Sequence, residues 1–204
     1  MKKILAIVCA LSMLFALCAC GESAAPASSA PAGEAAPAEE AAPAAADKVY
    51  NVGVCQLVQH PALDQATQGF VDALNEKLGE SVKVSVQNAA GDIPTCATIV
   101  GTFVSDEVDL IMANATPALQ AAQAATNAIP ILGTSITEYG VALGLDNFDG
   151  TTGINVSGTS DLAPLDGQAE VLHELFPDKA SVGILYCSAE ANSAYQVETI
   201  KPML

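Results

Sequence analysis

The chain has 204 residues, of which 51% are hydrophobic, and it carries a formal net charge of -16 at pH 7. All seven basic residues are Lys and none is Arg, so there is no basic patch to replace the counterions of a nucleic acid, and a nucleic-acid partner is disfavoured. An anionic group on a ligand must therefore be held by backbone amides, hydroxyls or Lys rather than by a bidentate guanidinium.

Residues 1–19 have the pattern of a bacterial lipoprotein signal peptide. Lys2 and Lys3 precede an apolar stretch, residues 4–17, which is too short to cross a bilayer but has the length of a secretory signal core. The stretch ends in "LCACG", which resembles a lipobox. We expect cleavage before Cys20 and lipidation of Cys20, which would hold the protein at the extracytoplasmic face of the cell membrane. An ordinary signal peptide with incidental cysteines is the alternative.

Residues 20–47 consist almost entirely of Ala, Pro, Glu and Ser, with no aromatic or large aliphatic side chain to bury. Such a composition cannot offset the entropy lost on ordering, so the segment is predicted to be a flexible tether. The tether and the lipid together indicate a globular head, residues 48–204, that works close to a membrane.

The head alternates strand-like and helix-like segments. Strands are predicted from β-branched apolar runs, and helices from apolar residues at helical spacing that end at residues such as Gly79. Strict alternation with short joints predicts an α/β fold, with parallel sheets covered by helices on both faces. The predicted strands are 50–58, 82–89, 109–115, 129–135, 152–158 and 181–186, and the predicted helices are 61–79, 94–105, 117–128 and 164–175. A further helix is expected after the loop "CSAEANS", up to the end of the sequence.

Polar loops follow five of these strands: "QLVQHPA", "NATPA", "GTSITE", "SGTSDLAP" and "CSAEANS". In parallel sheets, ligands bind beyond the carboxyl ends of the strands. Free amides at helix starts and nearby hydroxyls suit a carboxylate, while Asp161 and Glu190 can pair with an ammonium, so the loops fit a zwitterion. The candidate ligand-binding residues are Gln59, His60, Thr116, Thr134, Ser135, Asp161, Ser188, Glu190, Asn192 and Ser193.

Each of these residues also has a purely structural interpretation. Ser, Thr, Asn and Asp before a helix are more often N-caps than ligand contacts. Asp161 could cap the helix that starts near Pro164, and His60 could be a solvated turn residue before Pro61. The functional interpretation is favoured because all five loops are predicted to lie at the same edge of one sheet.

Several sequence segments resemble the substrate-binding lipoproteins of a family of ABC importers, similar to those associated with tryptophan and tyrosine uptake. The resemblance implies a type I periplasmic-binding-protein fold, in which two α/β lobes joined by a hinge close on an amino-acid-like ligand and deliver it to a membrane permease powered by an ATPase. It covers nearly all of residues 49–201. The segments that carry it are "VGVCQLVQHPALDQATQGFVDAL", "QNAAGD", "FVSDEVDLIMANATPALQAA", "IPILGTSIT", "NVSGTSDLAP" and "VGILYCSAEANSAYQVE".

Under this resemblance, residues 48–158 form the first lobe and residues 159–204 begin the second. Two lobes of about 100 to 150 residues each require roughly 200 to 300 residues, and the head falls short of that length. The second lobe is therefore expected to be incomplete, in a truncated chain or fragment.

Motifs for other chemistry are not found. The sequence has no G-x-S-x-G elbow and no G-x-x-x-x-G-K-[ST] loop, so neither a hydrolase of that type nor a P-loop nucleotidase is expected. The stretch "LDNFDG" fails as a calcium loop because Leu145 stands where the first acidic ligand belongs. Cys55, Cys96 and Cys187 show no C-x-x-C spacing and make no zinc set with the two His residues. We expect no enzymatic activity, no cofactor and no metal.

The leading hypothesis is thus a solute-binding lipoprotein of an ABC importer that captures an amino acid. The alternative is a lipoprotein of the same fold that senses a ligand and signals to a membrane receptor. A cytoplasmic repressor of similar fold is disfavoured, because a signal sequence stands where a DNA-binding segment should be. The resemblance suggests aromatic amino acids, and a smaller aliphatic ligand remains open because the head has few aromatic residues.

Overall fold

The computed structural model describes residues 48–178 and 180–204. The predicted signal peptide, the predicted lipidation site Cys20 and the predicted tether lie outside these described residues. Within the described ranges, no helix is both long enough and apolar enough to cross a membrane.

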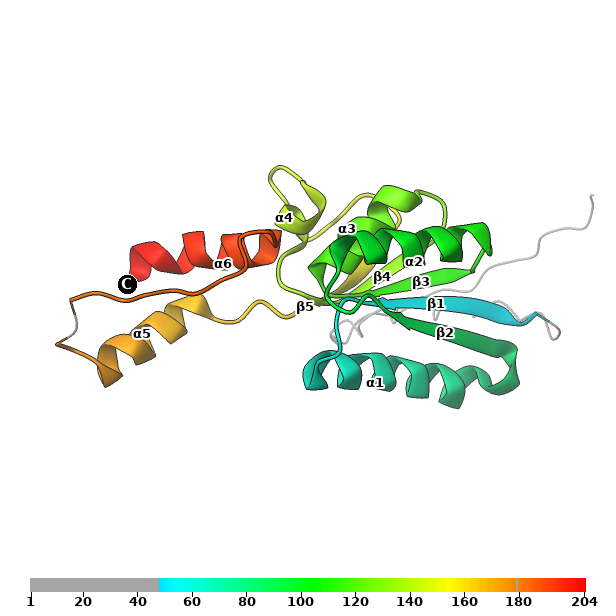
Figure 1. Ribbon diagram of the computed structural model, residues 1–204, viewed down its shortest axis with the longest axis horizontal. Helices are drawn as coiled ribbons and strands as arrows, with labels where there is room; N and C mark the ends of the chain where they lie inside the picture. The colour runs from blue at the N-terminus through cyan, green and yellow to red at the C-terminus, as the bar shows by residue number, and fades with distance from the viewer. Residues whose placement is uncertain (1–47, 179) are drawn as a thin grey trace, which may run out of the picture. The chain divides into compact units, whose positions relative to one another are not determined.

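The centre of the fold is a sheet of five parallel strands in the order β2-β1-β3-β4-β5 (Figure 1). The predicted α/β architecture is confirmed. The inner strands are short and rich in Val, Ile, Leu and Met, as expected for parallel strands that are covered on both faces. The strands are β1 (Tyr50–Gln56), β2 (Val82–Asn88), β3 (Leu110–Asn114), β4 (Ile131–Ile136) and β5 (Val156–Ser160).

The helices begin at recognisable start signals. His60 caps α1, where its Nδ1 accepts from the amide of Ala62, and Asp92 caps α2, where its carboxylate accepts from the amide of Thr95. The four predicted helices 61–79, 94–105, 117–128 and 164–175 are confirmed as α1, α2, α3 and α5, and the helix expected after the "CSAEANS" loop is confirmed as α6. Helix α4 is an addition that the sequence did not signal. The helices are α1 (Pro61–Leu78), α2 (Ile93–Ser105), α3 (Thr116–Ala125), α4 (Tyr139–Leu143), α5 (Leu165–Leu175) and α6 (Ala191–Ile200), with short 3₁₀ turns η1 (Gly79–Ser81) and η2 (Lys201–Met203).

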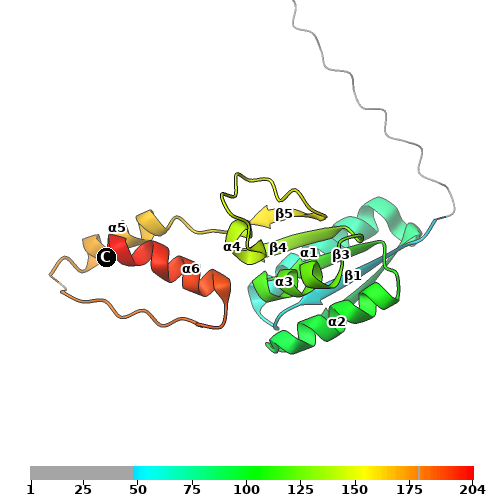
Figure 2. The same ribbon diagram turned by 90° about the horizontal axis from the view of Figure 1, so that it is seen from above.

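Helix α1 covers one face of the sheet, and α2 and α3 cover the other (Figures 1 and 2). The larger core lies under α2 and α3, where Phe103, Ile111 and Leu119 are buried together. The ring of Phe103 lies so close to β1 that a Cβ placed on Gly53 would come within 2.6 Å of it. Only glycine fits at position 53, and α2 can therefore pack tightly on the sheet.

An ion pair lies at the amino edge of the sheet, where β1 begins. Lys48 Nζ lies 2.7 Å from Asp109 Oδ1, and Asp109 Oδ2 accepts from the amide of Asn51 at 2.8 Å. The hydrogen bond between the two side chains lowers the pKa of Asp109 and raises the pKa of Lys48. These contacts attach the start of β1 to the start of β3.

Strand β5 begins later than predicted. The sequence indicated a strand over residues 152–158, whereas β5 covers Val156–Ser160. The side-chain Nδ2 of Asn155 donates to the carbonyls of Thr126 and Ile129, and the hydroxyl of Thr152 donates to the carbonyl of Val156. These side-chain hydrogen bonds hold residues 152–155 in a loop, so β5 begins only at Val156.

The predicted strand 181–186 is wrong. Residues 181–187 pair with no strand in the described part of the chain, and the side chain of Leu185 is fully exposed. A strand needs a neighbour for its backbone hydrogen bonds, and an apolar β-branched run cannot supply one by itself. We call residues 161–204, which hold this stretch with α5 and α6, the C-terminal segment, and residues 50–160 the sheet region.

Candidate functional site

The strand order changes direction at the carboxyl ends of β1 and β3. The chain proceeds outward from β1 to β2, returns to β3, and continues on the other side to β4 and β5. Gln56 and Asn114 are the last residues of β1 and β3, and they are register partners. In open parallel sheets this switch point is where ligands bind, because the loops on its two sides diverge.

A buried polar network lies at the switch point. Thr67 of α1 donates to Gln56 Oε1 at 2.7 Å, and Gln56 Nε2 donates to Asp64 Oδ1 at 2.6 Å. Asn114 Nδ2 donates to Thr67 Oγ1 at 2.9 Å and to the carbonyl of Leu63 at 2.8 Å. The network joins the carboxyl ends of both central strands to α1, so the polar side chains are held in fixed orientations.

Two buried oxygen atoms beside this network have no hydrogen-bond partner among residues 48–178 and 180–204. They are Asn114 Oδ1 and Thr116 Oγ1, whose residues are 0% and 2% exposed. Buried polar atoms are satisfied in the great majority of cases, so two unsatisfied atoms on neighbouring residues indicate a ligand position.

The amino end of α3 lies at the same place and is not capped by a side chain. The N-cap residue is Ala115, which has no side-chain oxygen to offer. The first amides of a helix lack partners within the helix and favour negative charge, which makes this end suitable for a carboxylate. The Thr116 hydroxyl can add a hydrogen bond to the same group.

Backbone strain also gathers at this edge. Ala90, Ala115 and Ser135 follow or end β2, β3 and β4, and they have φ values of 54°, 91° and 56°. Such left-handed values are uncommon for residues with a side chain and are often retained where function requires them. Their occurrence at the carboxyl ends of three of the five strands supports a site along this edge.

A hollow of about 550 Å³ opens beside the network, at the ends of β1 and β2. Its walls combine polar side chains with the apolar groups of Val58 and Val86, as is usual for small-molecule sites. Gln59, one of the predicted ligand contacts, lines it together with Asp64.

Six of the ten predicted ligand residues lie at this carboxyl edge. Gln59 and His60 form the link from β1 to α1, and Thr116 begins α3. Thr134 and Ser135 are half-buried near the end of β4, and exposed Asp161 directly follows β5.

Asp161 is not the cap of α5, since α5 has no side-chain cap. Its charge instead acts on Tyr139, whose pKa is raised to about 12, first by burial and then by Asp161. The Tyr139 hydroxyl lies 3.0 Å from the carbonyl oxygen of Gly133 and 3.3 Å from that of Thr159, and so joins β4 to β5.

The other four predicted residues form a group at the start of α6. Ser188 is exposed in a turn before the helix, and Ser193 Oγ donates to Glu190 Oε2 at 3.3 Å. Asn192 Oδ1 is buried without a partner in the described structure. The expectation that all five loops leave one sheet is wrong for this loop, because the residues before it are not a strand of the sheet.

Sequence reasoning missed Gln56, Asp64, Thr67 and Asn114 as site residues. Gln56 and Asn114 end runs of apolar strand residues, "VGVCQ" and "LIMAN". A polar residue at the last position of a buried strand was the available signal, since such a side chain needs a buried partner.

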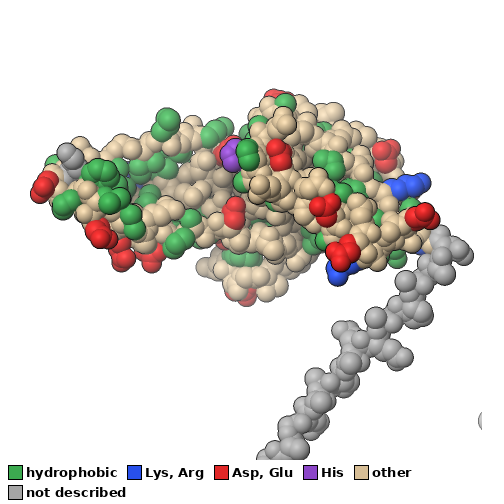
Figure 3. Space-filling model, turned by 90° about the horizontal axis from the view of Figure 1, so that it is seen from below, with side chains coloured by type: hydrophobic (Ala, Val, Ile, Leu, Met, Phe, Trp, Pro, Cys, Tyr) green, Lys and Arg blue, Asp and Glu red, His purple; other side chains and the backbone are tan. Residues whose placement is uncertain are grey.

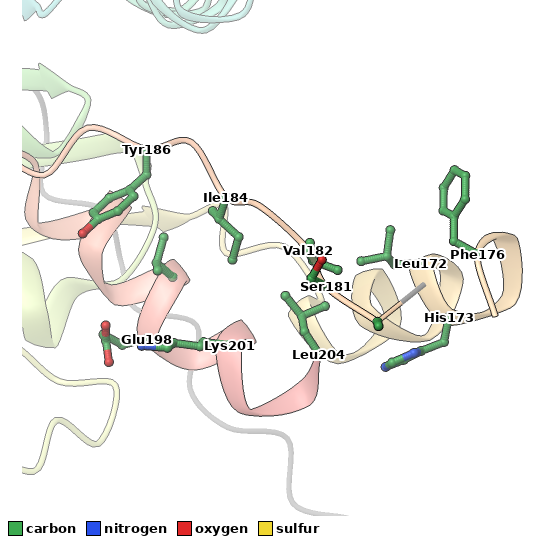
Figure 4. Close-up of a pocket in the computed structure, with 12 residues that line it drawn as sticks. Leu172, His173, Phe176, Ser181, Val182, Ile184, Tyr186, Glu198, Lys201 and Leu204 are labelled. Atoms are coloured by element: carbon green, nitrogen blue, oxygen red, sulfur yellow. The ribbon is translucent and has the colours of Figure 1, made fainter. Parts of the chain in front are cut away.

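A larger hollow of about 700 Å³ lies in the C-terminal segment between α5, residues 181–186 and α6. Figure 4 shows its side chains, most of them apolar, which include Leu172, Val182, Ile184 and Leu204. Since it lacks a cluster of oriented polar groups like that at the sheet edge, the larger hollow is the weaker candidate for a zwitterion.

The sequence profile of the family described as ABC transporter substrate binding protein matches residues 51–204. The chain belongs to this family. Membership confirms the resemblance that the sequence segments indicated, and these substrate-binding proteins are not enzymes.

Relatives of known sequence or structure agree with this membership. The chain is 43% identical over 156 residues to the tyrosine-binding protein of Clostridioides difficile strain R20291, covering 75% of this chain and 45% of that protein. It is similar to the structure of an ABC domain in complex with L-Trp from Streptococcus pneumonia (38% identity, TM-score 0.68, 74% of this chain and 52% of that one). A conserved domain protein from Vibrio cholerae gives 34% identity and a TM-score of 0.71, covering 76% and 53%. This substrate-binding family member thus spans about half the length of the relatives it matches.

Proposed function

We propose that the chain is part of an extracytoplasmic solute-binding lipoprotein that captures an amino acid, aromatic in our preferred version, and delivers it to an ABC permease. The carboxyl edge of the sheet region would form one wall of the binding site. The observation that carries the proposal is the pair of buried oxygens without partners, Asn114 Oδ1 and Thr116 Oγ1, beside the uncapped start of α3.

The ligand's carboxylate would sit at the start of α3. Backbone amides there and the Thr116 hydroxyl would donate to it, which fits a chain that has no Arg. Asn114 Oδ1 can only accept a hydrogen bond, so it would face the ligand's ammonium, and Asp161 would add negative charge on that side. The names of two relatives, a tyrosine-binding protein and a domain in complex with L-Trp, support an aromatic side chain on the ligand.

The lipid anchor is proposed from the sequence of residues 1–20. Globomycin blocks the peptidase that cleaves lipoprotein signals, so treated cells should accumulate a longer precursor, and Cys20→Ser should abolish the incorporation of labelled fatty acid. Unchanged length under globomycin, or lipid labelling that survives Cys20→Ser, would contradict the anchor. An operon with permease and ATPase genes would favour transport over the sensing alternative, for which a neighbouring receptor kinase gene is expected.

The binding proposal is tested by calorimetry with L-tryptophan, L-tyrosine and L-leucine, and with fructose as a ligand that is not an amino acid. Because this chain spans about half of its relatives, the titrations should use both the 204-residue chain and the longest natural product of its gene. We expect heat of binding with at least one amino acid and none with fructose. Absence of binding to every amino acid in both proteins would overturn the proposal.

Thr116→Val tests the carboxylate position sharply. The Thr116 hydroxyl has no partner in the part of the chain that the structure describes, so its loss should leave the free energy of unfolding unchanged or slightly higher. The ligand's affinity should fall by about tenfold or more, because a hydrogen bond to a charged group is lost. Thr98→Val, on the exposed side of α2, is the matched control and should change neither quantity.

Asp161→Ala and Ser188→Ala should weaken binding without unfolding the protein. Unchanged affinity in all three variants, Thr116→Val, Asp161→Ala and Ser188→Ala, would mean that the site is misplaced.

A further inference from the structure

The buried network at the switch point contains two side-chain amides, and the first of them, Gln56, has only one suitable orientation. Gln56 Nε2 donates to Asp64 Oδ1 at 2.6 Å and to the carbonyl oxygen of Val58 at 2.9 Å. A carboxylate and a peptide carbonyl have no hydrogen to donate, so a reversed amide would place its own oxygen against two acceptors. Gln56 therefore presents the acceptor Oε1 to Thr67.

Thr67 transmits this orientation to the second amide, that of Asn114. A hydroxyl has a single hydrogen, and Thr67 Oγ1 donates it to Gln56 Oε1 at 2.7 Å. Toward Asn114 the hydroxyl can therefore only accept, and it accepts from Asn114 Nδ2 at 2.9 Å. The carbonyl oxygen of Leu63 accepts from the same nitrogen at 2.8 Å. Both contacts use Nδ2, so Oδ1 is the atom that remains for a ligand.

The atom that remains is an acceptor in a buried position. Asn114 Oδ1 has no hydrogen-bond partner within residues 48–178 and 180–204, and Asn114 is 0% exposed. Gln56 and Thr67 are 4% and 7% exposed, so water has little access to the bonds that orient the amide. A ligand satisfies Oδ1 only by donating a hydrogen bond to it, and a carbonyl oxygen at the same place would meet another acceptor.

We propose that Gln56 and Thr67 are positioning residues that hold the Asn114 amide in this one orientation. The site then selects ligands that carry a hydrogen-bond donor beside the carboxylate, and it rejects ligands that carry an acceptor there. This inference rests on the proposed function, because it takes the ligand's carboxylate to lie at the start of α3. It adds discrimination between an amino acid and the α-keto acid with the same carbon skeleton.

The two kinds of ligand should respond differently when Thr67 is changed. An amino acid binds the amide orientation that is already present. An α-keto acid binds well only after the Asn114 amide turns over, so its affinity is lowered by the free energy of that turn. Thr67→Val removes one of the two hydrogen bonds of Asn114 Nδ2 and makes the turn easier. The affinity for the keto acid should therefore rise, and the affinity for the amino acid should stay the same.

The test is calorimetric titration of the 204-residue chain and of the longest natural product of its gene with matched sets of three ligands. Each set holds an amino acid, its keto acid and the acid that has neither group. The sets are L-tryptophan, indolepyruvate and indolepropionate; L-tyrosine, hydroxyphenylpyruvate and hydroxyphenylpropionate; and L-leucine, ketoisocaproate and isocaproate. In the parent protein, the amino acid should bind at least about tenfold more tightly than its keto acid.

In Thr67→Val, affinity for the keto acid should rise about three- to tenfold, as expected for the loss of one hydrogen bond, and affinity for the amino acid should change by less than about twofold. The acid with neither group gains nothing from a turned amide and should bind both proteins alike. Thr67→Ser keeps the hydroxyl and should restore the discrimination of the parent. Thr102→Val, which removes an exposed hydroxyl from α2, is the matched control and should change no affinity.

Gln56→Met tests the same inference by a second route. Without Gln56 Oε1, the Thr67 hydroxyl is free to donate to Asn114 Oδ1 of the turned amide, so affinity for the keto acid should again rise. Circular dichroism checks that each variant is folded at the temperature of the titration.

Three results would separate the inference from the proposed function. Affinities for the amino acid and the keto acid that stay unchanged or fall together in the folded variants would show a structural role only, and would overturn the inference. A keto acid that binds the parent as tightly as the amino acid would overturn it as well. The proposed function would survive both results. Binding of no amino acid would overturn the proposed function, and this inference with it.

Discussion

The sheet region and the C-terminal segment contain similar apolar residues, but these residues are buried in the sheet region and largely exposed in the C-terminal segment. Phe103 of the sheet region is 2% exposed, whereas Phe176 of the C-terminal segment is 51% exposed. Strand β3 is buried between two neighbouring strands, whereas residues 181–187 have strand-like composition and no strand partner. In the space-filling view, apolar side chains gather at the surface of the C-terminal segment, to the left (Figure 3). The comparison shows that burial comes from neighbours that the fold supplies, and composition alone does not provide it.

The largest difference is expected from matched phenylalanine substitutions. Phe103→Ala should lower the free energy of unfolding by about 3 to 5 kcal/mol, because it leaves a cavity against β1. Phe176→Ala should lower it by less than about 1 kcal/mol, because that ring has little packing to lose. Urea unfolding followed by circular dichroism measures both. Equal losses would mean that the C-terminal segment is packed as tightly as the sheet region.

A matched pair of threonines sharpens the comparison for polar groups. Thr67→Val should cost about 1 to 3 kcal/mol, because it leaves Gln56 Oε1 and one Asn114 amide hydrogen buried without their partner. Thr199→Val removes only a bond to the carbonyl of Tyr195 within α6 and should cost no more than about 0.5 kcal/mol. The same urea titrations apply. A small loss for Thr67→Val would show that water replaces the network without cost.

Tyr139→Phe tests the junction between β4 and β5. At neutral pH, loss of the hydroxyl should cost about 1 kcal/mol, because the hydrogen bonding to the carbonyls of Gly133 and Thr159 is lost. The pKa of Tyr139 is raised to about 12, above the ordinary value of 10.0, so the folded state holds this proton more tightly than the unfolded state. The resulting stability is present below pH 10 and is lost as pH rises through 12.

The variant should therefore lose less stability than the parent between pH 10 and 12. Thermal unfolding at a series of pH values measures this difference, and Tyr195→Phe serves as the control on α6. Parallel curves for parent and Tyr139→Phe would contradict the assignment.

The smallest effect is expected from Leu185→Ser. Because the Leu185 side chain is fully exposed, its replacement should change the free energy of unfolding by no more than about 0.5 kcal/mol. Leu119→Ser, the matched change in the buried core, should cost several times more. Hydrogen exchange should also show faster exchange for amides of residues 181–187 than for those of β3. Strong protection of 181–187 would show that the stretch is paired after all.

Prediction from sequence succeeded where the signal was local. Pro61 at a helix start and Gly79 after its last turn gave the bounds of α1 to within a residue, because caps depend only on adjacent residues. It failed for residues 181–186, because strand formation depends on a partner elsewhere in the chain. The start of β5 was misplaced for a related reason, since the bonds of Asn155 reach residues far away in the sequence.

For the site, the sequence identified the loops better than the side chains within them. Thr116 was singled out because a hydroxyl at a helix start is a local pattern. Gln56 and Asn114 were missed because their importance comes from being register partners, and register cannot be derived from strand composition.

The ion pair of Lys48 and Asp109 fixes where the preceding chain joins the sheet. Since parallel strands all point the same way, this junction lies at the edge opposite the candidate site, and a strand of seven residues separates the two by about 20 Å. Whatever holds the protein through its amino-terminal side therefore pulls on the end that carries none of the proposed binding groups of the sheet region. If the protein were attached to an assay surface through its amino-terminal side, the binding edge of the sheet region would face the solution.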